Sequence, residues 1–147
     1  MYTLRPLSIA DYDKVYALWL SCSGMGLNNL DDSREGIERF LKRNPTTCFA
    51  AVDTDSVIGV ILAGHDGRRG YIYHTAVSPT RRKEGIGNTL VNAAMAALKA
   101  EGIHKAALVV FDRNKTGNAF WEKIGFTPRE DLVYRNKTIT KMKRIDT

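Results

Sequence analysis

Three basic side chains stand directly before two glycines at the point where an apolar helical pattern begins. The segment Thr80–Val91 reads TRRKEGIGNTLV. The first turn of a helix exposes backbone N–H groups without internal partners, and its dipole attracts phosphate oxygens. Glycine has no Cβ, so Gly85 and Gly87 can take positive φ and let a pyrophosphate approach the main chain. The segment therefore predicts a phosphate cradle. Its rim carries the positive charges of Arg81, Arg82 and Lys83.

The same segment has a less specific interpretation, a glycine-containing loop with solvated basic side chains. Other phosphate-binding motifs fit it less well than the cradle. A nucleoside triphosphatase loop requires Gly-Lys followed by Ser or Thr, and the chain has no such triplet. A dinucleotide-binding turn requires a third glycine followed about 20 residues later by an acidic residue, and this combination is absent. We therefore favour a cradle at the start of a helix.

Positive charge is concentrated in the second half of the chain. The whole chain has 22 Lys and Arg against 16 Asp and Glu, a net charge of +6. Residues 1–75 have 8 basic and 9 acidic side chains, and residues 76–147 have 14 and 7. We therefore expect the second half to meet an anion, either a polyphosphate cofactor or a nucleic acid. Nucleic acid is disfavoured because the chain has no recognisable reading helix.

Length and composition limit the class of protein. A chain of 147 residues with 44% hydrophobic content fits one domain over residues 1–147. It has no run of 18 apolar residues, and its start lacks the layout of a signal peptide. We therefore expect no membrane partner and a cytoplasmic location. Cys22 and Cys48 form neither a disulfide framework nor a metal-ligand spacing, so we expect small buried groups and no metal.

The spacing of apolar residues predicts an alternation of helices and strands. The expected helices cover about 8–23, 32–44, 86–101 and 115–124. The expected strands cover 48–52, 57–63, 71–77 and 105–111, with short ones near 126, at 132–134 and at 138–143. Tight turns join the first three strands into an antiparallel meander. The strand at 105–111 is continuously apolar, which is typical of a strand parallel to its neighbour, here 71–77. Gly102 is expected to cap the third helix.

Two motifs, together with the order of these elements, resemble one known family. The segment Arg82–Gly87 reads RKEGIG and follows Ala76–Pro79, which reads AVSP, at the end of a strand. The segment Trp121–Phe126 reads WEKIGF and follows Asn114. Over nearly the whole chain, these features resemble the GNAT superfamily of acetyl-coenzyme A-dependent N-acetyltransferases. The resemblance implies an α/β (α+β) fold with a mixed, mostly antiparallel sheet of about six or seven strands, four flanking helices, and two central parallel strands that splay apart.

The resemblance implies acetyl-coenzyme A as cosubstrate, held largely by the main chain. Its pyrophosphate would lie on amides between Lys83 and Asn88, and its pantetheine arm in the gap between the splayed strands. A backbone N–H near Val77 would stabilise negative charge on the thioester oxygen. The expected cofactor-binding residues are Ala76, Val77, Arg82, Lys83, Glu84, Gly85, Ile86, Gly87, Asn88, Asn114 and Trp121. Asn114 also fits as the cap of the helix that begins at Lys115, and the two roles are compatible.

The implied chemistry is direct attack of a neutral amine on the thioester while both substrates are bound. Many relatives have a tyrosine at the position of Trp121, where it protonates the leaving thiolate. An indole N–H can donate a hydrogen bond but hardly a proton, so Trp121 is expected to pack against the cofactor. Tyr134 is a candidate proton donor instead, and His74 a candidate base that acts directly or through water. Packing is the alternative role for both.

The acceptor amine depends on loops about which the sequence says little. They contain Asn28, Asn29, Asp31 and Asp32 on one side and Glu130 and Asp131 on the other. These carboxylates could hold a cationic amine, or they could be solvated or cap helices, as Asp32 does before the second helix. A small amine and a protein N-terminus both stay open. A coenzyme A-binding module with little or no transferase activity is the alternative function. Relatives in the family often form homodimers.

Overall fold

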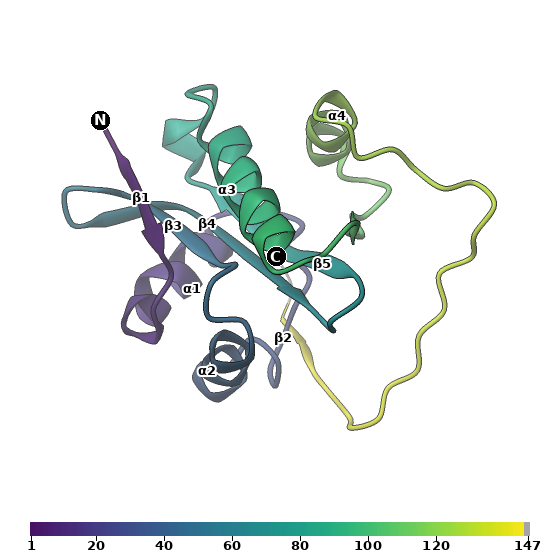
Figure 1. Cartoon of the computed structure of the whole chain (residues 1–147). Helices are drawn as coiled ribbons and strands as arrows, with labels where there is room; N and C mark the ends of the chain where they lie inside the picture. Colours follow the sequence, from purple (N-terminus) through teal and green to yellow (C-terminus); the bar gives the residue numbers. More distant parts are fainter. Residues whose placement is uncertain (146–147) are drawn as a thin grey trace.

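The structure, a computed structural model, describes residues 1–145 and is built on a five-stranded sheet (Figure 1). Its strands are β1 (Thr3–Pro6), β3 (Phe49–Asp53), β4 (Ser56–His65), β5 (Gly70–Val77) and β6 (Ala106–Ala107), in the order β1-β3-β4-β5-β6. Neighbouring strands from β1 to β5 pair antiparallel, whereas β6 pairs parallel with β5. The predicted meander, the α+β fold and the parallel pair are therefore confirmed, although β6 lies at the edge of the sheet and not at its centre.

Helices cover both faces of this sheet (Figure 1). They are a short 3-10 turn η1 (Ile9–Asp11) and the helices α1 (Tyr12–Leu20), α2 (Arg34–Arg43), α3 (Ile86–Ala100) and α4 (Lys115–Lys123). On one face, α1 and α2 share a core with Val60 and Leu62 of β4. On the other face, α3 and α4 pack on a core that contains Ile61 and Ala63. Because β4 is buried on both faces, its sequence is apolar almost throughout.

The third helix, α3, follows the amphipathic pattern of the sequence. Its buried residues are Ile86, Leu90, Val91, Ala94 and Leu98. Gly102 lies just beyond its end with φ +82°, and the Ile103 N–H donates to the Leu98 carbonyl at 3.0 Å. This left-handed ending confirms the predicted glycine cap. With 15 residues α3 is the longest helix, and no helix within residues 1–145 is long and apolar enough to cross a membrane.

The C-terminal part of the chain differs from the sequence prediction. Residues 127–143 contain no strand and run along the outside of the molecule (Figure 1), so the strands expected near 126, at 132–134 and at 138–143 are wrong. The chain returns through β7 (Arg144–Ile145), which pairs with β2 (Leu27–Asn28) in a separate two-stranded sheet. Local β propensity cannot show whether a sheet edge is available for pairing. The same limit explains why β1 and β2 were missed.

Both cysteines are buried and free, as the sequence analysis expected. The Cys48 thiol contacts the Ala63 carbonyl oxygen at 3.3 Å, inside the core beneath β4. Burial raises the pKa of the Cys48 thiol to about 11. A thiol that stays protonated near neutrality is a poor nucleophile, so Cys48 serves packing.

A buried carboxylate ties the N-terminal strand to the first helical turn. Asp11 accepts two hydrogen bonds at 2.8 Å from the Arg5 guanidinium on β1 and a third at 3.0 Å from the Ser8 N–H. The Ser8 hydroxyl in turn accepts from the Ala10 N–H, which completes a capping box at the start of the helix. The hydrogen bonds from Arg5 hold the pKa of Asp11 below its ordinary value. Ionised Asp11 therefore fixes where β1 ends and α1 begins.

Replacing Asp11 with Asn should lower the free energy of unfolding at pH 7 by about 1.5 kcal/mol, because hydrogen bonds to an ionised group are lost. Since the folded-state pKa of Asp11 is lowered, its stabilisation is present above an ordinary carboxyl pKa of about 4 and is lost as pH falls further. Urea unfolding of wild type and Asp11→Asn should therefore converge at acid pH. Asp13→Asn, at an exposed pair with Arg34, is the control and should change stability by less than about 0.5 kcal/mol. A pH-independent gap for Asp11→Asn would contradict this account.

Candidate active site

The two parallel strands separate after a very short contact. Only Gly70 with Ala106 and Tyr71 with Ala107 are paired. Beyond these residues Leu108–Phe111 diverges from β5, so the strand predicted over 105–111 is much shorter than expected. The divergence opens a cleft with a volume of about 1690 Å³. The splayed geometry implied by the family resemblance is therefore present, and it leaves the outer edge of β5 without a strand partner.

A bulge in β5 determines which side chains face which layer. Ile61 of β4 pairs with Thr75 and Ala63 pairs with Ile72, so two residues of β5, Tyr73 and His74, oppose a single residue of β4. As a result Ile72 packs with the α3 core, whereas Ala76, four residues later, packs with the α1 core. The bulge thus turns His74 toward α1 and the loop before α2.

The start of α3 has the geometry expected of an anion site. Gly85 has φ +79° and Lys83, although not a glycine, has φ +66°. Thr89 is the first residue of α3 whose N–H reaches a carbonyl oxygen, that of Gly85 at 3.0 Å. Within the described residues the N–H groups of Ile86 and Gly87, like that of Asn88, have no acceptor. A Cβ built on Gly85 would meet no heavy atom within 4 Å, so the main chain is open on this side.

The second glycine of the motif has a different role from the predicted one. Gly87 lies inside α3 and does not take positive φ. A Cβ at this position would come within 3.2 Å of the Phe120 ring on α4. Gly87 is therefore required for the close approach of α4 to the first turn of α3, and the expectation of positive φ at Gly87 is wrong.

The basic side chains before the helix divide into two groups. Arg81 pairs with Asp53 at 2.7 Å and with Glu84 at 2.8 Å, and these contacts lower the pKa of both carboxyl groups. Arg81 thus anchors the loop to the turn between β3 and β4 and does not add free charge to the rim. Arg82 and Lys83 are exposed and line the cleft. They are the two cations of the motif that face a ligand in the cleft.

The opposite wall of the cleft comes from α4. Asn114 accepts a hydrogen bond from the Gly117 N–H at 2.9 Å, which confirms its role as the cap of α4. Trp121 is half-buried between the rings of Phe120 and Phe126, with centroids 5.0 and 5.2 Å away. Both Asn114 and Trp121 also line the cleft. The indole is thus a rigid part of the wall.

His74 forms a close pair with Asp32, which was predicted to cap the second helix. Its Nε2 lies 2.6 Å from Oδ1 of Asp32, and the two side chains are 14% and 5% exposed. The other oxygen of Asp32 accepts from the Asn28 N–H at 2.8 Å. The Trp19 ring packs edge-on against the imidazole, with centroids 4.9 Å apart. Because a carboxylate only accepts hydrogen bonds, Nε2 carries the proton and Nδ1 is left as an acceptor.

Asp32 does not cap α2, contrary to the sequence prediction. Ser33 is the cap, since its hydroxyl accepts from the Gly36 N–H at 3.0 Å. Asp32 and His74 are 42 positions apart in the sequence, and no local signal predicts their contact. Only the bulge in β5 and the loop before α2 bring the two together.

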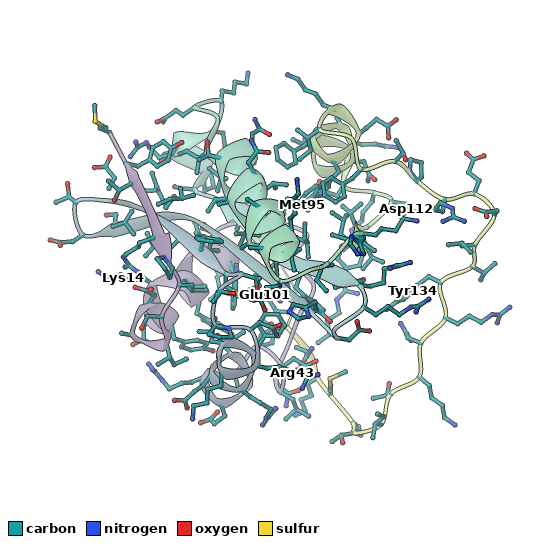
Figure 2. All side chains as sticks on the ribbon, in the orientation of Figure 1. Lys14, Arg43, Met95, Glu101, Asp112 and Tyr134 are labelled. Atoms are coloured by element: carbon teal, nitrogen blue, oxygen red, sulfur yellow. The ribbon has the colours of Figure 1, made fainter. Side chains whose placement is uncertain are left out.

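Tyrosines surround the middle of the cleft. Tyr134 lies on the outer segment 127–143, is 66% exposed, and is directed toward the sheet from that segment (Figure 2). Tyr71 and Tyr73 of β5 also line the cleft, with ring centroids 4.6 Å apart and ring planes tilted by 49°. Burial, followed by the proximity of Tyr134 and Tyr73, raises the pKa of Tyr71 to about 12. Tyr71 therefore stays protonated and neutral.

The structure brings the predicted site residues together in one place. The predicted catalytic and cofactor-binding residues all line the same cleft, except Glu84, whose carboxylate pairs with Arg81. Of the candidates for the acceptor side, Asn28, Asp31 and Asp32 line it, whereas Asn29, Glu130 and Asp131 do not. Along it, an anion cradle at the start of α3 is followed by an unpaired strand edge and then by the pair of His74 and Asp32. This order suits a ligand whose phosphate lies at the cradle and whose extended arm lies along the strand edge. A second reactant would then lie next to His74.

Comparisons with known proteins agree with this geometry. Residues 12–126 match the model of the acetyltransferase (GNAT) family. An acetyltransferase of Photorhabdus laumondii subsp. laumondii is 32% identical over 131 residues, 88% of this chain and 90% of that protein.

Solved structures share the fold at lower identity. The PaiA N-acetyltransferase of Thermoplasma acidophilum in complex with coenzyme A superimposes with a TM-score of 0.75, at 19% identity over 90% of this chain and 93% of that one. A predicted acetyltransferase of Clostridium acetobutylicum with acetyl-coenzyme A gives 0.70, at 21% identity over 92% and 96%. The chain belongs to the acetyltransferase (GNAT) family.

Proposed function

We propose that this acetyltransferase moves the acetyl group of acetyl-coenzyme A to a primary amine, which attacks directly while both substrates are bound. One observation carries the proposal: the open first turn of α3, with N–H groups that have no acceptor in the described chain, lies at the end of a strand whose outer edge is unpaired. The acceptor is a small amine or a peptide N-terminus, and the single domain of residues 1–147 is the catalytic unit.

The residues of the cleft fit the cosubstrate. The N–H groups from Lys83 to Asn88 would hold the pyrophosphate, and Arg82 with Lys83 would balance its charge. The pantetheine arm would lie along Ala76 and Val77, opposite Leu108–Phe111, with Asn114 and Trp121 beside it. Thr75 also lines the cleft, and its hydroxyl is buried with no hydrogen-bond partner in the described residues. Acetyl-coenzyme A, when bound, supplies the activated acyl group.

His74 is the proposed base that takes the proton of the incoming ammonium, directly or through one water. Asp32 accepts the Nε2–H of His74, so it fixes the tautomer and stabilises the imidazolium that forms. Trp19 and the Asn28 N–H hold the pair in place. A backbone N–H near Val77 would face the oxygen that becomes negative in the tetrahedral intermediate.

Tyr134 is the proposed proton donor to the departing sulfur. It lines the cleft and is 66% exposed, whereas burial raises the pKa of Tyr71 to about 12 and also raises the pKa of Tyr73. An alkyl thiol has a pKa of about 8.5, so its thiolate leaves readily near neutral pH and can take a proton from water. Loss of Tyr134 should therefore slow turnover without abolishing it.

A coenzyme A-binding module without transfer activity is the second candidate, and Trp121 in place of the family's tyrosine favours it. The two candidates differ in one measurement. Acetyl-coenzyme A stabilises both against unfolding, but only the enzyme releases free coenzyme A thiol when amines are added.

Replacing Gly85 with Asp should abolish binding of acetyl-coenzyme A, because a carboxylate would stand where phosphate is expected. Wild type at about 100 times the dissociation constant should gain about 2.7 kcal/mol in thermal unfolding, and Gly85→Asp should gain nothing. Gly67→Asp is the matched control, since Gly67 also has positive φ and open space around it, but lies in the turn between β4 and β5. It should carry the same backbone strain and keep the full gain. Equal gains in both variants would refute the cradle.

Replacing His74 with Gln should lower kcat/KM for a small amine at neutral pH by about a hundredfold or more, because the proposed general base is lost. Asp32→Asn should act in the same direction by a smaller factor. His65→Gln is the control, because His65 pairs with Glu101 at 3.1 Å in a more exposed histidine–carboxylate pair outside the cleft. Stabilisation by acetyl-coenzyme A should stay unchanged in all three variants. A His74→Gln enzyme with the wild-type rate and pH profile would exclude His74 as the base.

A further inference from the structure

Two arginines of α2 line the cleft without an acidic partner. Arg39 and Arg43 stand four residues apart, so they lie one turn apart on the same face of the helix. The other cations of α2 are paired, Arg34 with Asp13 at 3.0 Å and Lys42 with Glu38 at 4.0 Å. Within the described residues neither Arg39 nor Arg43 has an ion pair or a hydrogen bond. Their charges are therefore available to a ligand in the cleft.

These arginines are distant from the phosphate cradle. In Figure 1, α2 lies at the lower side of the molecule, whereas the first turn of α3 lies near the top, and Figure 2 labels Arg43 beside α2. The side of the cleft that they line is completed by Phe40, which packs edge-on against Tyr73 with ring centroids 5.5 Å apart. The positive charge of α2 therefore lies at a part of the cleft away from the cradle (Figure 1).

Negative charge lies at the inner end of the same region. Asp31 and Asp32 both line the cleft just before α2, and Asp32 contacts His74. Asp31 is exposed and accepts from the Asn28 side-chain amide at 3.0 Å. Its charge contributes, after burial, to the raised pKa of Tyr73, so it lies near that ring. Along the acceptor side, carboxylates next to the base are thus followed by arginines further out.

We propose that the acceptor is the N-terminal amine of a peptide with acidic residues shortly after it. The proposal rests on the proposed function, because it takes His74 to mark the position of the reacting amine. Asp31 and Asp32 would attract the ammonium group, and Arg39 and Arg43 would bind carboxylates, which a guanidinium can hold with two hydrogen bonds.

Distances along α2 indicate at which positions of the acceptor peptide the acidic residues should lie. At 1.5 Å per residue, Arg39 and Arg43 lie about 8 and 14 Å along the axis from Arg34, where the helix begins. An extended peptide advances about 3.4 Å per residue, so the matching side chains are at about positions three to five. A free amino acid is too short, because its ammonium and carboxylate share one carbon.

The test compares acetylation of three peptides, Ala-Ala-Glu-Glu-Glu, Ala-Ala-Gln-Gln-Gln and Ala-Ala-Lys-Lys-Lys. Wild type should prefer the Glu over the Gln peptide by about tenfold in kcat/KM, and the preference should shrink with added salt. The double variant Arg39→Gln, Arg43→Gln should lose the preference, and Arg39→Glu, Arg43→Glu should favour the Lys peptide. Lys42→Gln, on the same helix but paired with Glu38, is the control and should keep the wild-type order.

Two further readouts keep the outcomes distinct. Stabilisation by acetyl-coenzyme A should be the same in every variant, which shows that the fold and the cradle are intact. Calorimetric binding of the three peptides to the coenzyme A-loaded protein tests recognition without turnover. If no amine releases thiol but the acidic peptide still binds preferentially, the proposed transfer reaction fails and only the recognition of acidic side chains by Arg39 and Arg43 holds. The inference would be overturned if kcat/KM and affinity were the same for the Glu, Gln and Lys peptides, or if no peptide bound.

Discussion

The early separation of β5 from the chain after Ala107 is the constraint on which the rest of the site depends. Two residues of parallel pairing hold the strands together at one end, and the bulge at Tyr73 and His74 bends β5 where pairing has ceased. Backbone groups at an unpaired edge need a partner from water or ligand. In a longer parallel pair this edge of β5 would be hydrogen-bonded to the next strand. Here the edge is unpaired, and an extended ligand could bind along it.

The elements around this edge each supply one kind of interaction. The first turn of α3 supplies N–H donors, which are accessible because Gly85 has no side chain over the main chain. Gly87 lets α4, which forms the opposite wall, approach this turn. The loop before α2 supplies Asp32, whose contact with His74 crosses from a loop to the central sheet. Arg81 is neutralised by two carboxylates, and its pair with Asp53 holds the cradle loop to the end of β3. Charge is thus sorted along the cleft, with cations at each end and carboxylates between them.

Periodic and local features of this protein could be predicted from its sequence, and long-range contacts could not. The apolar spacing of α3, its cap at Gly102, the meander and the glycine motif all have their causes within a few residues. His74 and Asp32 are 42 positions apart, and no local pattern in either segment predicts their contact. Local sequence indicated strands within 127–143, but strand formation depends on a free edge, and the chain pairs β7 with β2 instead. Positive φ was wrongly predicted for Gly87, because the actual need for glycine there is its contact with Phe120, which lies on another helix.

A crystal structure of the protein grown with coenzyme A would test the central claim most directly. The account predicts pyrophosphate oxygens within hydrogen-bond distance of the backbone nitrogens of Ile86, Gly87 and Asn88, and an arm that runs along the outer edge of β5. Coenzyme A bound elsewhere, or a β5 edge closed by residues of the chain itself while the ligand is present, would contradict it.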